Sequence, residues 1–300
     1  YLYSGIVGKP RIERRFVAKA VGDFHLSSRS VWGIYSCMKI LLLPGETSRI
    51  TWAWIALIPV FCIVPPGVAA GDQALTGDRI PGLGGDLIVH PVDHASLLLG
   101  WKSEVIYVDP IGGAARYASS PPPTLVLITH MHGDHLDLAT LEAVAGERSD
   151  LVVPPTVAEK LPANLRRRTK VLANGEETAL RGLSCRAVPA HNLTADRLKY
   201  HPKGRDNGYV LNLGGQRVYL SGDTEDIPEM RALENIGVAF VCMNLPYTMD
   251  VEKAAEAVRA FKPGIVYPYH SRGSDLEKFK TLVGTDLGIE VRLRAWYANK

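Results

Sequence analysis

Three histidines and an aspartate lie within one short segment of the chain. The segment Thr129-His130-Met131-His132-Gly133-Asp134-His135 directly follows the apolar run Leu125–Ile128, which is typical of a buried β-strand. Three imidazoles and a carboxylate therefore project from a single loop at the carboxyl end of a strand. Imidazole nitrogens and carboxylate oxygens bind Zn²⁺ and similar cations, and catalytic sites combine a few of them with an open position for water. The segment predicts a catalytic metal site.

Further residues of the same chemical types follow later or earlier apolar runs. His191 comes after Leu183–Val188, Asp223 after Val218–Leu220, and His270 after Ile265–Tyr267, while Asp109 comes directly after Val105–Val108. With this pattern, five or six of the nine histidines of the chain have an explanation. Chance placement therefore no longer accounts for them.

The elements that would position these residues alternate short apolar runs with turn signals and a few helical stretches. One domain of about 220 residues from Asp86 onward fits this pattern. The predicted strands are Leu87–Pro91, Ser96–Leu99, Val105–Val108, Leu125–Ile128, Leu151–Val153, Leu183–Val188, Tyr209–Leu213, Val218–Leu220, Val238–Cys242, Ile265–Tyr267 and Glu290–Arg294. The predicted helices are Asp137–Ala145, Thr156–Leu161, Pro228–Glu234, Val251–Phe261 and Asp275–Val283. Both halves of this domain are rich in strands, with helices after the segments that carry candidate ligands. This pattern favours an α/β fold with a four-layer αββα sandwich.

The order of the candidate ligands resembles that of the metallo-β-lactamase superfamily, from Asp86 to Arg294. The superfamily has an acidic residue at an early strand end, the His-x-His-x-Asp-His cluster, a lone His, a lone Asp and a last His. The resemblance implies the αββα fold and a site for two divalent metal ions. Zinc is the expected metal, with manganese or iron as alternatives. The resemblance implies that one metal is bound by His130, His132 and His191, and the other by Asp134, His135 and His270. It also implies that Asp223 bridges the two metals and that Asp134 and Asp223 are the catalytic carboxylates.

The third ligand of the first metal has a competing candidate. The stretches around His191, around His201-Pro202-Lys203-Gly204 and around Tyr247 are similar to the L-ascorbate 6-phosphate lactonase-like branch of the superfamily. In that branch an aromatic residue often stands at the position of His191, and the histidine of the His-Pro-Lys-Gly stretch approaches the metals. We expect His191 to be the third ligand, with His201 as the alternative.

Other residues are expected beside the metals rather than on them. Asp109 is interpreted as a residue that orients the loop or a ligand histidine, with a simple strand-ending turn as the alternative. His94 precedes an apolar strand and is expected to be a structural histidine, with contact at the edge of the site as the alternative. Lys203 and Tyr247, together with Arg205 and Arg272, border the site and are candidates for binding an anionic substrate group, or ordinary solvated loop residues.

Composition and charge exclude some classes of function. The chain has 300 residues, of which 46% are hydrophobic and 22% charged, as in globular proteins. Its formal charge is +3, but residues 1–70 carry eight Lys and Arg against three acidic residues, which leaves 26 basic and 28 acidic residues in the remainder. Nucleic acid is therefore not an expected partner. The expected partner is a small-molecule substrate, and the oligomeric state is left open.

The N-terminal part predicts export. The uncharged run Ile50–Val64 is followed by Pro65-Pro66-Gly67 and by the small residues Val68-Ala69-Ala70, as in a signal peptide cleaved after Ala70. Met38 is a candidate true start, so residues 1–37 are interpreted as an over-extended N-terminus, 38–70 as the signal peptide and 71–300 as the hydrolase domain. A periplasmic protein without a membrane span is expected after cleavage, and a membrane-anchored one without cleavage. The cysteines after residue 70, Cys185 and Cys242, are expected to be buried free thiols.

These observations predict an exported hydrolase that uses two metals to activate water against a lactone, ester or phosphodiester bond. Hydrolysis of β-lactams is an alternative within the same class. A di-iron redox protein on the same fold is another, although the chain lacks an appended flavin-type domain. A non-catalytic metal-binding sensor is a third alternative, which the complete ligand set argues against.

Overall fold

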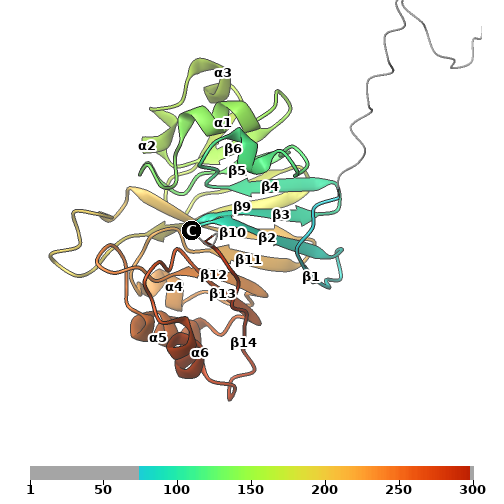
Figure 1. Ribbon diagram of the computed structural model, residues 1–300. Helices are drawn as coiled ribbons and strands as arrows, with labels where there is room; N and C mark the ends of the chain where they lie inside the picture. The colour runs from blue at the N-terminus through green and yellow to red at the C-terminus, as the bar shows by residue number, and fades with distance from the viewer. Residues whose placement is uncertain (1–73, 298–300) are drawn as a thin grey trace, which may run out of the picture. The chain divides into compact units, whose positions relative to one another are not determined.

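The computed structural model describes residues 74–297, in which the strands form two seven-stranded sheets (Figure 1). The predictions for residues 1–37 and 38–70 therefore concern residues outside the described part. None of the helices in the described part has the length and apolar character needed to cross a bilayer.

The first sheet keeps its strands in chain order. Its members are β1 (Asp78–Ile80), β2 (Leu87–Asp93), β3 (Ser96–Trp101), β4 (Glu104–Val108), β5 (Leu125–Leu127), β6 (Asp150–Val153) and β7 (Thr169–Val171). The strands β1 to β4 pair antiparallel, and β4 to β7 pair parallel. The parallel strands all end at one edge, where their loops meet.

The second sheet repeats this plan. Its members are β8 (Glu177–Leu180), β9 (Leu183–Ala190), β10 (Asp206–Leu213), β11 (Gln216–Leu220), β12 (Val238–Cys242), β13 (Ile265–Tyr269) and β14 (Glu290–Val291). The strands β8 to β11 form an antiparallel meander, and β12 to β14 continue it in parallel. Each half of the chain thus contributes one mixed sheet.

Helices cover the outer face of each sheet. The first sheet carries the 3₁₀ helix η1 (Ala114–Tyr117) and the helices α1 (Leu138–Val144), α2 (Pro155–Ala158) and α3 (Ala163–Arg166). The second carries α4 (Pro228–Arg231), α5 (Val251–Phe261) and α6 (Leu276–Val283). In Figure 1, α1 to α3 lie on one side of the two sheets and α4 to α6 on the other. The predicted four-layer αββα sandwich is confirmed.

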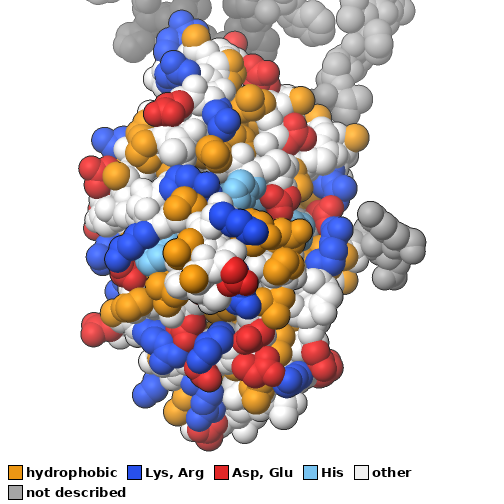
Figure 2. All heavy atoms as spheres, turned by 90° about the vertical axis from the view of Figure 1, so that its left-hand side faces the viewer, with side chains coloured by type: hydrophobic (Ala, Val, Ile, Leu, Met, Phe, Trp, Pro, Cys, Tyr) orange, Lys and Arg blue, Asp and Glu red, His pale blue; other side chains and the backbone are white. Residues whose placement is uncertain are grey.

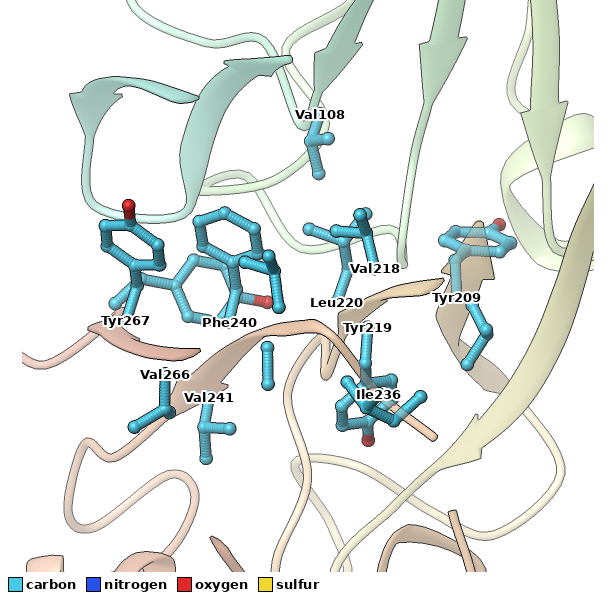
Figure 3. Close-up of a cluster of buried hydrophobic side chains, with 14 of the residues drawn as sticks. Val108, Tyr209, Val218, Tyr219, Leu220, Ile236, Phe240, Val241, Val266 and Tyr267 are labelled. Carbon is cyan, nitrogen blue, oxygen red and sulfur yellow. The ribbon is translucent and has the colours of Figure 1, made fainter. Parts of the chain in front are cut away.

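Successive side chains of a strand point alternately to the outer helices and to the core between the two sheets. In the first sheet, Leu98 and Val126 pack outward with Leu141 of α1, whereas Leu97 and Leu127 belong to the core between the sheets. Figure 3 shows the same alternation in the second sheet: Phe240 and Tyr267 point toward Val108 of the first sheet, and Val241 and Val266 point the other way. Both faces of the central strands are buried, which explains their continuous apolar runs.

Helix starts follow from local chemistry. Asp137, Asp250 and Asp275 accept backbone N–H bonds at the first turns of α1, α5 and α6. Buried free thiols at Cys185 and Cys242 are confirmed.

The sequence missed the edges of the fold. The strands β1, β7 and β8 and the helix α3 were not predicted, and β14 covers only Glu290–Val291 of the predicted Glu290–Arg294. The missed strands have three or four residues, and in β7 and β8 all of these residues are exposed or only partly buried. They carry little of the apolar periodicity on which prediction depends.

The packing of the core between the sheets can be tested by its contribution to the free energy of unfolding. Phe240 is fully buried and stacks on Tyr267 with ring centroids 5.1 Å apart. We expect Phe240→Ala to lower the free energy of unfolding by about 3–5 kcal/mol, because it removes buried area and leaves a cavity. Urea unfolding of metal-free protein measures this value. The control Leu83→Ala, at a fully exposed position, should change it by less than about 0.5 kcal/mol; equal effects would contradict this core.

Candidate metal centre

The candidate ligands gather at one edge of the two sheets. The loop that holds His130, His132, Asp134 and His135 follows β5, Asp223 follows β11, and His270 follows β13. β5 belongs to the parallel part of the first sheet, and β13 belongs to the parallel part of the second. The loops after these two strands bring together residues that are more than 130 positions apart in the sequence. Figure 2 shows histidine side chains reaching the surface of this face, with Lys and Arg side chains close by.

One group of imidazoles consists of His130, His132 and His201. One ligand atom from each lies within 4.8 Å of the others. His130 Nε2 is 3.1 Å from His132 Nδ1, and His201 Nε2 is 3.3 Å from Asp223 Oδ2. Three nitrogens this close, with an adjacent carboxylate, could hold one divalent cation.

A second group of side chains, His135, His270 and Asp134, also lies beside Asp223. His135 Nε2 is 3.4 Å from Asp223 Oδ1, and His270 Nε2 is 3.4 Å from both Asp223 Oδ2 and Asp134 Oδ2. His94 joins this group, with its Nε2 3.2 Å from Asp134 Oδ2. Asp223 therefore contacts imidazoles of both groups.

A carboxylate behind the site orients His135. Asp109 is fully buried, and its Oδ2 accepts a hydrogen bond from His135 Nδ1 at 2.7 Å. The same carboxylate accepts bonds from the backbone N–H and the hydroxyl of Thr129. With the proton held on Nδ1, the Nε2 lone pair of His135 is directed into the site. The placement agrees with the orienting role expected of Asp109.

Asp206 holds His201 in a comparable way, and the sequence analysis did not include it. Its buried Oδ2 lies 3.1 Å from His201 Nδ1, and Arg205 donates to both of its oxygens at 2.7 and 2.8 Å. The signal available in the sequence was an acidic residue at the start of an apolar strand, five residues after a histidine. Such a signal is common and carries little information.

Backbone strain accompanies the site. His94, Asp109 and His270 have positive φ angles of 52, 44 and 44°, a conformation that non-glycine residues rarely adopt. Gly222, next to Asp223, also has a positive φ of 59°, and a Cβ there would lie 2.7 Å from the carbonyl oxygen of Asn207. The fold therefore holds these residues in backbone conformations that are locally unfavourable but place their side chains at the site.

The electrostatics of the group are strongly coupled. Burial would lower the pKa of His135, but the carboxylates of Asp223 and Asp109 raise it to about 9. Burial lowers the pKa of His130 well below its ordinary value. Burial would raise the pKa of Asp223, but His270, His135 and His201 hold it well below its usual range. Asp223 is thus a carboxylate that depends on surrounding positive charge.

The residues fit divalent metal ions. His135 Nε2, His270 Nε2 and Asp223 Oδ1 are buried and have no hydrogen-bond partner in the described part of the chain. Buried polar atoms without a partner are costly, and both imidazole nitrogens lie 3.4 Å from an oxygen of Asp223. An ion that accepts lone pairs would satisfy all of them. The mixed nitrogen and oxygen donor set is the one that zinc uses in hydrolytic sites.

His191, which the sequence analysis favoured as the third ligand, lies outside these groups, and His201 stands in its place. The two histidines flank one loop, where the N–H of Asn192 donates to the carbonyl of His201 at 2.8 Å. The backbone of His191 is bonded to Thr224, and burial lowers the pKa of its imidazole, whose charged neighbours are Glu229, Lys203 and Glu225. Sequence order alone does not determine which end of the loop turns its imidazole inward.

A cavity of about 670 Å³ opens over the metal groups. Of the residues expected beside the site, His94, His201 and Tyr247 line it, whereas Lys203 does not. His94 lies at the site and not apart from it, since its Nε2 is 3.2 Å from Asp134 Oδ2. The residues that line the cavity are Asp93, His94, Ile111, His132, Asp134, Tyr200, His201, Asp223, Asn244, Tyr247, His270 and Arg272. Tyr200 and Asn244 were missed, because single polar residues in loops give no periodic signal.

Comparisons with known proteins show the family of the chain. Residues 89–270 match the family described as β-lactamase superfamily domain. A UPF0173 metal-dependent hydrolase of Pyrococcus abyssi is 30% identical over 204 residues, which cover 63% of this chain and 89% of that protein. A crystal structure of a protein named as a metal-dependent hydrolase, from Parabacteroides distasonis, is 40% identical with a TM-score of 0.67, and covers 74% of this chain and 99% of that one.

A more distant structure supports the fold alone. The metallo hydrolase Igni18 of Ignicoccus hospitalis is 22% identical with a TM-score of 0.58, and covers 69% of this chain and 94% of that one. The chain belongs to the metallo-β-lactamase superfamily. Within it, the chain is a metal-dependent hydrolase.

The placement of the two competing histidines can be tested directly. We expect His201→Ala to lower the zinc bound per chain, because its Nε2 lies among the ligand atoms. His191→Ala should leave the zinc content unchanged, because its imidazole lies outside the groups. Metal analysis after dialysis against limiting zinc measures both. A larger loss in His191→Ala than in His201→Ala would contradict the geometry.

The role of Asp206 can be tested by an isosteric change. We expect Asp206→Asn to weaken zinc binding by about 10- to 100-fold, as is typical when the partner of a ligand histidine is lost. Competition with a chromophoric chelator measures the affinity. Asp196→Asn, at an exposed position of the loop that precedes β10, is the matched control. Unchanged affinity in Asp206→Asn, with a native circular dichroism spectrum, would refute the orienting role.

Proposed function

We propose that the site binds two divalent metal ions, with zinc as the physiological metal. His130, His132 and His201 hold the first, and Asp134, His135 and His270 hold the second. The observation that carries this proposal is the position of Asp223, whose oxygens lie 3.3 Å from His201 Nε2 in one group and 3.4 Å from His135 Nε2 in the other. A buried carboxylate in contact with both groups suits a bridging ligand.

In this proposal His94 orients Asp134. The oxygen of Tyr297 accepts the backbone N–H of Ser271 at 2.9 Å and lies 2.9 Å from His94 Nδ1. If the Tyr297 hydroxyl donates to Nδ1, the proton of His94 is on Nε2 and is donated to Asp134. Burial lowers the pKa of His94, which agrees with a neutral ring.

The proposed reaction is hydrolysis. When bound, two adjacent cations lower the pKa of water and polarise the substrate oxygen. The chain supplies the rest: Asp109 and Asp206 hold imidazoles in place, and the surrounding core buries His130, His135 and His270. Asp223 is almost fully buried, whereas the Asp134 side chain is 48% exposed and faces the cavity. Asp134 is therefore the carboxylate placed to accept a proton from the attacking water.

The proposed substrate is a small molecule with a lactone, ester or phosphodiester bond. A cavity of about 670 Å³ falls within the range typical of small-molecule sites. The similarity of the loops to lactonase-like members of the superfamily supports the first of these bonds.

Catalysis at this site can be tested with a double variant. We expect His132→Ala, Asp134→Ala to reduce kcat/KM by roughly a thousandfold or more, since the variant removes a ligand from each metal and several kcal/mol of transition-state stabilisation. Hydrolysis of lactone, aryl ester, phosphodiester and β-lactam substrates by zinc-loaded protein measures it. Equal activity of the variant and the wild type on every substrate would rule out catalysis here.

We also propose export to the periplasm, which the apolar run Ile50–Val64 and the small residues before Gly71 support. Expression of the whole chain in a Gram-negative bacterium should yield periplasmic protein that begins at Gly71, as read by N-terminal sequencing. Ala70→Trp should slow processing, because signal peptidase requires a small residue there. Uncleaved protein confined to the cytoplasm would contradict the proposal.

A further inference from the structure

The cavity over the metal groups has one cationic side chain on its wall. Among the described residues that line it, Arg272 is the single Lys or Arg. Arg272 also lines an adjacent cavity of about 610 Å³, so that it stands where the two meet. Its position two residues after His270 keeps it close to the second metal group.

The other basic candidates are engaged or lie elsewhere. Arg205 forms two hydrogen bonds with Asp206 and one with the carbonyl of Tyr200. Lys203 lines neither cavity. Arg116, on the wall of the adjacent cavity, is paired with Asp93 at 2.8 Å. That pair also neutralises Asp93, an acid shared by both cavities.

Arg272 is held in place without using its hydrogen-bond donors. Its guanidinium carbon lies 4.9 Å from the ring centroid of Tyr297, which is within the range of a cation–π contact. Tyr297 is itself fixed by bonds to Ser271 and His94. Arg272 makes no side-chain hydrogen bond or ion pair with any residue in the range 74–297, so its donors remain available to a ligand.

Aromatic side chains form another part of the wall. Tyr200 and Tyr247 pack edge to face with ring centroids 5.1 Å apart, and both line the cavity. They offer apolar surface to the carbon skeleton of a substrate, while the amide of Asn244 adds a polar group nearby. The cavity therefore combines a reaction centre, an apolar wall and one free cation.

We propose that Arg272 is the specificity-determining residue that binds an anionic group, a carboxylate or a phosphate, carried by the substrate beside its scissile bond. This inference rests on the proposed function and specifies its substrate class. A guanidinium matches both anions through paired hydrogen bonds. Neutral esters and lactones are then poorer substrates than their acidic analogues.

The first test compares matched substrates. Mono-4-nitrophenyl adipate and its methyl ester form the carboxylate pair, and 6-phosphogluconolactone and gluconolactone form the phosphate pair. We expect Arg272→Met to raise KM for the charged members by about 10- to 100-fold, in line with loss of a charge-assisted pair of hydrogen bonds. The neutral members should be unaffected, and Arg272→Lys should keep part of the discrimination.

The matched control is Lys199→Met. Lys199 is an exposed cation that lies 5.0 Å from the ring centroid of Tyr200 but does not line the cavity. Its loss should leave the ratio of charged to neutral substrates unchanged. If Lys199→Met and Arg272→Met reduce that ratio equally, the effect is one of general charge and the inference is overturned.

The second test does not require turnover. Calorimetry of zinc-loaded protein compares succinate with succinamate, and 3-phosphonopropionate with propionate. Arg272→Met should weaken binding of the doubly anionic member of each pair by about 10- to 100-fold and leave the other unchanged; the larger loss identifies the preferred anion. Equal binding by wild type and Arg272→Met overturns the inference. Absence of hydrolysis by the wild type would contradict the proposed function alone, since the binding comparison still decides the role of Arg272.

Discussion

The whole site depends on keeping one carboxylate, that of Asp223, buried among imidazoles. A buried carboxylate is costly unless positive charge or hydrogen bonds compensate it. Here His135, His201 and His270 surround Asp223, and their combined influence holds its pKa well below the usual range. Within residues 74–297, its Oδ1 has no hydrogen-bond partner. The protein therefore carries an electrostatic arrangement that divalent cations would complete.

Rigid elements impose this arrangement. Asp223 follows β11 in the second sheet, whereas His135 follows β5 in the first, so the distance between them is set by the packing of the two sheets. The core around Phe240 keeps that packing, and Asp109 and Asp206 fix two of the imidazoles from behind. The positive φ angles at His94, Asp109 and His270 show that the fold stores local strain where the ligands converge.

The charged side chains around the metal groups have two different roles, since some orient the histidines and one is open to a substrate. Carboxylates near the metal groups are used to orient histidines, and Arg205 is used to hold one of these carboxylates. Arg272 packs against the ring of Tyr297 instead, and it lines the cavity. Tyr297 also contacts His94, so one aromatic residue near the end of the chain connects the substrate wall with the second metal group.

The sequence by itself determined the fold class, the superfamily and most of the candidate ligands, because these features depend on residues that are close together in the sequence. Apolar runs specify buried strands, and His130, His132, Asp134 and His135 are close in space since they are close in sequence. Only the tertiary structure placed His201 rather than His191 beside His130 and His132, brought His94 to Asp134, and placed Asp206 behind His201. Those choices depend on where loops turn their side chains, and that direction is set by contacts between segments far apart in the chain.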